Sequence, residues 1–215
     1  MQGSTYNQKT WGLIMNAIVS IPNSFSVHTT GRREDVATPI YRDVKDEPVG
    51  FKIGYADGFA LSSQADVIIH HGGFGTISQW VLSTGERLIQ EREVLKTLLM
   101  DSNDDEISQF LDTLRGTPRS ISVCNTFEQE KNARRLNTLA GENICSVLTT
   151  DDVVDSLQGR DMIENIIKSK LTNPVDTHER LFWIQLVEQV STMNAPTHIA
   201  LILERMMDSV LQPGT

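Results

Sequence analysis

The chain has 215 residues, of which 39% are hydrophobic, and a formal net charge of -9. These values predict one large domain, or one domain with an appendage, and the acidic balance without any Lys/Arg-rich run argues against a nucleic-acid-binding surface. No stretch reaches the ~20 apolar residues of a membrane span and the start of the chain lacks a secretory signal, so we expect a soluble, cytoplasmic protein without a transmembrane segment.

The first part of the chain predicts one helix and two short strands. Thr10–Ile21 carries apolar residues at helical spacing, and Phe25–Thr29 is typical of a strand. Gly31–Pro48 is polar and predicts a loop, and Phe51–Tyr55 predicts a second strand. Leu61–Ala65 is long enough for one helical turn.

The middle of the chain alternates between strand and helix patterns. Val67–Ile69 is a continuous β-branched run, as in a strand that is buried on both faces. A glycine-rich turn, Gly72–Thr76, follows it, and a helix is expected to start near Ile77. Further strands and helices are then expected at Ile121–Cys124, at Gln129–Ala140 with Gly141 as its C-terminal glycine, at Ile144–Leu148, and after a cap at Thr150–Asp152.

This alternation predicts an α/β fold, with a Rossmann-like parallel sheet and flanking helices. Two segments depart from the alternation. Glu86–Pro118 is charged and predicts an inserted helical hairpin. His178–Leu211 predicts two helices separated near Pro196, and the second has an apolar face made of Ile199, Ile202, Leu203, Met206, Met207 and Val210.

The two cysteines, Cys124 and Cys145, both fall in expected strands. Neither has the spacing of a metal site, so we expect buried free thiols, which a reducing compartment would permit. The adjacent histidines His70 and His71 point to opposite faces of a strand, and no matching cluster lies near them, so we expect no metal. His70 is expected to pack rather than to bind a ligand.

The segment from His70 to Thr76 has the features of an anion site. Ligands bind at the carboxyl ends of the strands in open α/β sheets, and glycines allow a ligand to approach the backbone closely. The amides and the dipole of the following helix favour an anion, and His71 and Thr76 offer further donors. These features predict a diphosphate cradle, although a tight turn without a ligand fits the same pattern.

Two stretches resemble the donor-binding motifs of GT-B glycosyltransferases, in particular the UDP-glycosyltransferases and the macrolide and sterol glycosyltransferases. They are ADVIIHHGGFGTISQWVLSTG, which begins at Ala65, and GTPRSISVCNTFEQEKNARRLNTLAGENICSVLT, which begins at Gly116. Gly3–Thr5 resembles the Gly-Ser loop of the same domain. The resemblance implies the C-terminal half of a GT-B fold, with a nucleotide-sugar-binding domain over 1–171, its insertion over 86–118, and a C-terminal helical segment over 172–215.

The resemblance also implies a role for each matching residue. The donor diphosphate would contact His71, Gly73, Phe74, Gly75, Thr76 and Ser4. The donor ribose and sugar would contact Gln79, Glu128, Gln129 and Asn132. From the residues alone, a solvated helix N-terminus explains Glu128 and Gln129 equally well.

Three departures from the family pattern bear on function. Gln79 stands where the family usually has a ribose-binding glutamate, so any hydrogen bond there lacks charge assistance. The segment 86–118 separates the two motifs. No residue matches the base that the family places on its N-terminal domain, so the catalytic residue is unknown and an acceptor-binding domain or partner chain is expected.

The expected function is transfer of a sugar from a UDP- or TDP-sugar to an acceptor hydroxyl. The nucleotide sugar is a co-substrate, and neither a cofactor nor a metal is expected. Two alternatives remain open. One is a non-catalytic remnant of such an enzyme that serves as a binding or assembly module, and the other is a protein related to nucleotide-sugar epimerases.

Overall fold

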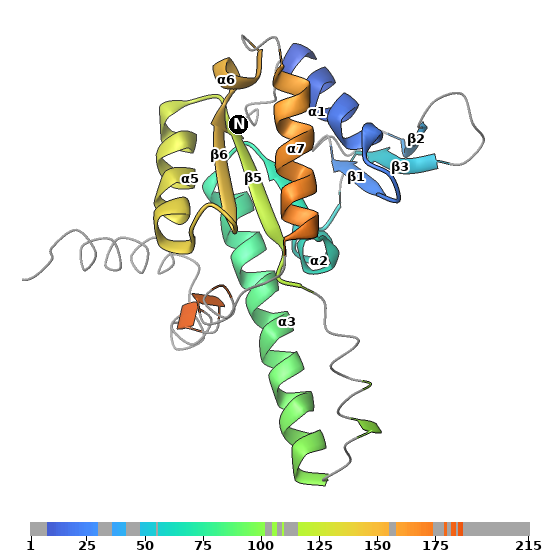
Figure 1. Ribbon diagram of the computed structural model, residues 1–215, viewed down its shortest axis with the longest axis vertical. Helices are drawn as coiled ribbons and strands as arrows, with labels where there is room; N and C mark the ends of the chain where they lie inside the picture. The colour runs from blue at the N-terminus through green and yellow to red at the C-terminus, as the bar shows by residue number, and fades with distance from the viewer. Residues whose placement is uncertain are drawn as a thin grey trace, which may run out of the picture.

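The computed structural model describes residues 8–29, 36–41, 48–54, 56–101, 105–106, 109, 116–154, 158–173, 179, 182–183 and 185–186. These residues form two three-stranded sheets with helices packed around them (Figure 1). The fold is therefore a mixed α/β fold with a parallel sheet and flanking helices, as expected from the sequence.

The larger core surrounds sheet B, whose strand order is β4-β5-β6. Its strands are β4 (Val67–His70), β5 (Arg119–Cys124) and β6 (Cys145–Thr149), and both pairings are parallel. All residues of β5 are buried, because the strand has a neighbour on each side and helices on both faces. Burial along the whole of β5 is typical of an interior strand in a parallel α/β sheet.

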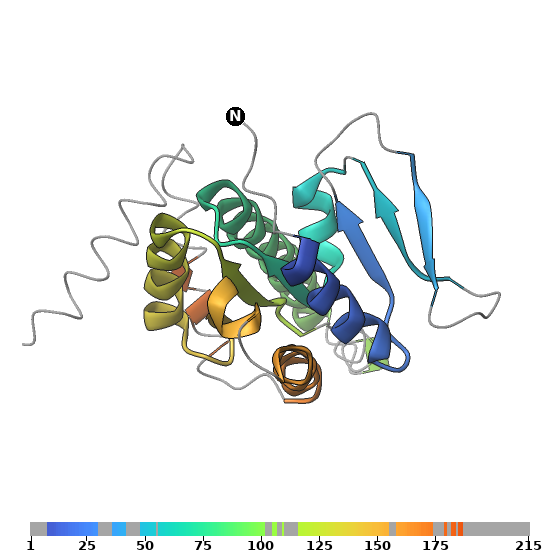
Figure 2. The same ribbon diagram turned by 90° about the horizontal axis from the view of Figure 1, so that it is seen from above.

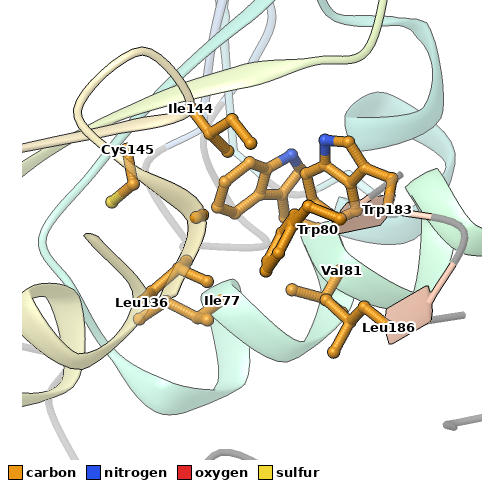
Figure 3. Close-up of a cluster of buried hydrophobic side chains, with 10 residues drawn as sticks. Ile77, Trp80, Val81, Leu136, Ile144, Cys145, Trp183 and Leu186 are labelled. Carbon is orange, nitrogen blue, oxygen red and sulfur yellow. The ribbon is translucent and has the colours of Figure 1, made fainter. Parts of the chain in front are cut away.

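Helices α3 (Phe74–Asp101) and α5 (Phe127–Ala140) cover one face of sheet B (Figure 2). Their buried side chains meet Cys145 of β6 and three residues of the C-terminal part, Phe182, Trp183 and Leu186, in a cluster centred on Trp80 and Trp183 (Figure 3). The two indole rings lie 5.3 Å apart in an edge-to-face arrangement. The cluster comprises Ile77, Trp80, Val81, Leu136, Ala140, Ile144, Cys145, Phe182, Trp183 and Leu186.

The opposite face of sheet B is covered by α1 (Gln8–Ser20), α6 (Thr150–Val154) and α7 (Gly159–Thr172). Here α1 packs on α7, and both place aliphatic side chains over β5. This second cluster comprises Ile14, Ala17, Ile21, Ile121, Val123, Val153, Ile163 and Ile167. Burial of each such side chain stabilises the fold by about 1.5–3 kcal/mol.

Sheet A has the order β1-β3-β2 and lies beside sheet B (Figure 2). β1 (Ser26–Thr29) is parallel to β3 (Pro48–Ile53), and β2 (Thr38–Tyr41) is antiparallel to it. Helix α2 (Gly58–Gln64) then leads from sheet A to β4. The prediction of a loop throughout 31–48 is wrong over β2, whose Pro39 is tolerated because β2 is an edge strand.

Three other expectations differ from the structure. The sequence predicts one doubly wound sheet, whereas β1 and β4 lie in separate sheets. Because β4 is an edge strand, Val67, Ile68 and Ile69 are only partly buried rather than fully enclosed. Helix α3 begins at Phe74, before Ile77, and continues without a break into the segment expected to be an insertion.

A buried ion pair joins Glu179 to Arg119 at the start of β5. Arg119 Nη2 lies 3.0 Å from Glu179 Oε2, and both side chains are almost fully buried. Thr117 Oγ1 also donates to Glu179 Oε1 at 2.6 Å. Nη1 of Arg119 donates to the carbonyl oxygens of Lys170 and Asn173 at 2.7 and 2.8 Å. The pair therefore anchors Glu179 beside the start of β5 and the end of α7.

We predict that Glu179→Gln lowers the free energy of unfolding by about 3 kcal/mol, because Arg119 stays buried without its counter-ion. Urea unfolding followed by circular dichroism measures this loss. The control is Glu93→Gln, which breaks an exposed pair with Lys96 and should leave the midpoint unchanged. Equal effects of the two substitutions would contradict the anchoring role.

Candidate functional site

The two motifs meet at the carboxyl edge of sheet B. Helix α3 begins at Phe74, after β4, and α5 begins at Phe127, after β5. Since β4 and β5 are parallel neighbours, the starts of the two helices lie at the same end of the sheet. This end is where open α/β sheets bind ligands.

Gly72 brings the turn after β4 against the first turn of α5. Its φ angle is +81°, and a Cβ at this position would lie 2.7 Å from the Gln129 carbonyl oxygen and 3.0 Å from Cys124 Sγ. A residue with a side chain would be strained by that φ angle and would collide with backbone. The close approach of the two motifs therefore requires glycine.

His70 stabilises this turn through a hydrogen bond with the Gly72 amide. It is buried, its Nδ1 accepts a hydrogen bond from the Gly72 amide at 3.0 Å, and its Nε2 lies 3.3 Å from Ser122 Oγ. Because Nδ1 is an acceptor, the ring proton belongs on Nε2. Burial, and secondarily the charge of His71, lower the pKa of His70 to about 3. His70 therefore packs inside the protein, as expected, and the absence of a ligand contact stays a prediction.

His71 lies on the other side of the turn and is partly buried. A Cβ on Gly73 would lie 2.5 Å from its Nε2, so the imidazole rests against the residue that precedes α3. Burial lowers the pKa of His71, which favours the neutral ring. A neutral imidazole beside the start of a helix offers one N–H donor to an anion.

The start of α3 presents backbone amides that helix bonding does not use. The amide of Ile77 makes the first intrahelical bond, to the Gly73 carbonyl oxygen at 3.1 Å. The amides of Phe74, Gly75 and Thr76 precede that bond and so lack an acceptor within the helix. Gly75 is exposed, with no heavy atom within 4 Å of a Cβ placed on it. The helix start is thus accessible and electrostatically suited to a phosphate.

The second motif caps α5 with its own side chains. Thr126 Oγ1 accepts from the Gln129 amide at 3.3 Å, and Gln129 Oε1 accepts from the Asn125 amide at 2.9 Å. This arrangement is close to a reciprocal capping box, which the Thr-x-x-Gln spacing could have indicated from the sequence. The sugar contact of Gln129 stays a prediction, and the carboxamide oxygen already has a partner.

The remaining residues predicted to contact the donor are found on α5, next to α2, or outside the described residues. Glu128 is exposed and Asn132 is partly buried on α5. The Gln79 side chain lies against Gly58 at the start of α2, where a Cβ would collide with Oε1. Ser4 lies outside the described residues, as do Gly3 and Thr5. An exposed phenyl ring that sequence reasoning did not single out, Phe127, stands beside Glu128 with 81% of its surface accessible.

Both cysteines are buried free thiols, as predicted. Burial raises the pKa of Cys124 to about 12 and also raises the pKa of Cys145, so neither is a thiolate at neutral pH. Over the part of the chain that the structure describes, no cluster of three or more His, Cys, Asp or Glu side chains could hold a metal ion. Of the helices described, none is long and apolar enough to cross a membrane.

Comparison of the chain with protein-family models, with curated proteins and with solved structures finds no match. The geometry of the site combines an accessible helix start, a neutral imidazole beside it, and a second capped helix on the adjacent strand.

We predict that Gly72→Ala lowers the free energy of unfolding by about 2 to 4 kcal/mol, because it adds a strained φ angle and a collision with the Gln129 carbonyl. Thermal or urea unfolding measures the change. Gly75→Ala is the matched control in the same turn. Its Cβ enters open space inside a helix, so it should stabilise slightly, by about 0.5 kcal/mol. A mild effect of Gly72→Ala would mean that the turn and α5 are not in close contact.

The lowered pKa of His70 predicts that the free energy of unfolding decreases at acidic pH. Its pKa is about 3 in the folded chain and 6.5 when unperturbed, so between these values the unfolded chain binds more protons and stability falls as the pH falls. From pH 7 to pH 5 the wild type should lose about 2 kcal/mol more than His70→Gln, which has no such proton. Urea unfolding at both pH values measures the difference. Parallel losses would show that His70 is not the source.

Proposed function

We propose that this chain binds a nucleotide sugar, a UDP- or TDP-sugar, and acts as the donor-binding half of a glycosyltransferase. The acceptor would be held by a separate domain or a partner chain. The sugar moves to an acceptor hydroxyl, and the nucleoside diphosphate is the leaving group.

One observation carries this proposal. The segments around Gly72 and Gln129 are far apart in the sequence, yet a Cβ on Gly72 would lie only 2.7 Å from the Gln129 carbonyl oxygen. A diphosphate at the start of α3 would therefore have the start of α5 beside it. A nucleotide sugar needs such neighbouring sites, because its diphosphate and its sugar are covalently joined.

The proposed roles follow from what each element offers. The diphosphate is held by the imidazole of His71 and by the backbone amides of Gly73, Phe74, Gly75 and Thr76. The same groups stabilise the negative charge that develops on the diphosphate as the sugar leaves. On the other helix, Glu128 and Asn132 offer acceptors and a donor to sugar hydroxyls, together with Gln129. Gln79 is the proposed ribose contact, and its side chain would have to leave Gly58 to make it.

The described histidines suggest where the general base does not lie. Both ring nitrogens of His70 are engaged, and His28 is stacked on Trp11 with ring centroids 3.7 Å apart. Burial, with the Lys52 charge, lowers the pKa of His28 to about 4. These observations favour a second candidate, a nucleotide-sugar-binding module without catalytic activity of its own. An acceptor-side partner that restores transfer would distinguish the enzyme from this module.

We predict that the folded chain binds UDP or TDP, and that His71→Ala and Thr76→Val each weaken this binding by about 10- to 100-fold through loss of a hydrogen bond to a charged group. Isothermal titration calorimetry measures the affinities. Glu128→Gln is the matched control. It should weaken the binding of a UDP-sugar or TDP-sugar and leave the binding of UDP or TDP unchanged. Absence of binding heat with every nucleotide and nucleotide sugar, in a sample that unfolds cooperatively, would refute the proposal.

A further inference from the structure

We propose that the phenyl ring of Phe127 stacks on the apolar C–H face of the donor sugar and so positions that sugar beside the diphosphate. The proposal rests on the proposed function and adds to it a contact to which the resemblance assigns no residue. The sugar would then have an aromatic partner as well as the hydrogen-bonding groups of Glu128 and Asn132.

Phe127 stands at the end of sheet B that holds the candidate site. It is the first residue of α5, directly after the cap residue Thr126. The Cα–Cβ bond of a helical residue tilts toward the N-terminus of its helix, so a side chain at the first position extends toward and past the helix start. The start of α5 lies at the same end of the sheet as the start of α3, because β4 and β5 are parallel neighbours.

The protein itself covers little of this ring. Phe127 is 81% exposed, whereas Phe74, the first residue of α3, is 39% exposed. One turn along α5 from Phe127 lie Glu130, which pairs with Arg134, and Lys131, so its own helix offers the ring no apolar partner. Neither hydrophobic cluster of the described residues includes Phe127. A flat apolar surface is therefore accessible beside the candidate site.

The polar groups beside Phe127 suit only the rim of a sugar. Glu128 is exposed, Asn132 is partly buried one turn further along α5, and the carboxamide oxygen of Gln129 already accepts from the Asn125 amide. In a pyranose with equatorial hydroxyls, the hydroxyls surround the ring and its faces carry C–H groups. A phenyl ring complements such a face, because contact between the two removes apolar surface from water.

The order of the proposed contacts assigns Phe127 to the sugar rather than to the nucleoside. Gln79, the proposed ribose contact, belongs to α3, and the diphosphate is proposed to bind at the start of the same helix. The diphosphate joins the nucleoside to the sugar, so a nucleoside beside α3 leaves the start of α5 to the sugar. Phe127 is on α5, next to Glu128.

Calorimetric titration tests this assignment by comparing the affinity for a nucleotide sugar with the affinity for the nucleoside diphosphate alone. The probes are UDP and TDP and their glucose, galactose and rhamnose derivatives, and the wild-type chain identifies the nucleotide sugar that binds most tightly. We expect Phe127→Ala to lower the affinity for that nucleotide sugar by about tenfold, because the stacked apolar area is lost. The affinity for the matching diphosphate should stay unchanged.

Two further variants make the comparison specific to the ring and to its place. Phe127→Tyr keeps a flat aromatic ring and should keep the affinity for the nucleotide sugar. Phe25→Ala is the matched control, because Phe25 is 62% exposed but stands directly before β1 of the other sheet, and it should leave both affinities unchanged. Thermal unfolding checks that all three variants fold, as expected for side chains that are mostly in water.

The outcomes separate this proposal from the proposed function. If Phe127→Ala weakens the nucleotide sugar and the free diphosphate equally, the ring contacts the nucleoside and the proposal is overturned. An unchanged affinity for the nucleotide sugar would also overturn it, as would a wild-type chain that binds UDP or TDP but none of their sugar derivatives. A folded chain that binds neither the diphosphates nor their sugars would overturn the proposed function itself.

Discussion

The candidate site depends on the approach of the Gly72 turn to the first turn of α5. Only glycine satisfies both the φ angle of +81° and the closeness of the Gln129 carbonyl. His70 fixes the same turn through the Gly72 amide and links it to Ser122 on the neighbouring strand. The starts of α3 and α5 are thereby set relative to each other by backbone contacts and a buried imidazole, before any ligand arrives.

The support for this turn extends across the sheet. β5 lies between β4 and β6 and is buried throughout, so a shift of β5 would move both helix starts. At the opposite end of that strand, Arg119 binds Glu179 and the carbonyl oxygens of Lys170 and Asn173 at the end of α7. β5 therefore connects the Arg119–Glu179 ion pair to the candidate site. The charged pair is costly to bury, which explains why Arg119 also receives backbone acceptors.

The sequence predicts the elements whose signals are local. β4, α5 and β6 are found close to their expected positions because a β-branched run, helical spacing and a C-terminal glycine are read within a few residues. β2 was missed because Thr-Pro-Ile-Tyr becomes a strand only by pairing with β3. The split into two sheets likewise depends on pairing between distant segments. At the site, Thr-x-x-Gln suits both a helix cap and a ligand contact, so the sequence alone could not identify the bond from Gln129 to the Asn125 amide.

The placement of the three tryptophans gives the chain two separate optical reporters. Trp80 and Trp183 are buried edge to face at 5.3 Å, close enough for their electronic transitions to couple, so near-ultraviolet circular dichroism would register whether Trp183 is packed against Trp80. Trp11 instead stacks on His28 where α1 meets sheet A, and its emission responds to that contact. Spectroscopy on the unmodified protein can thus follow the two sheets independently.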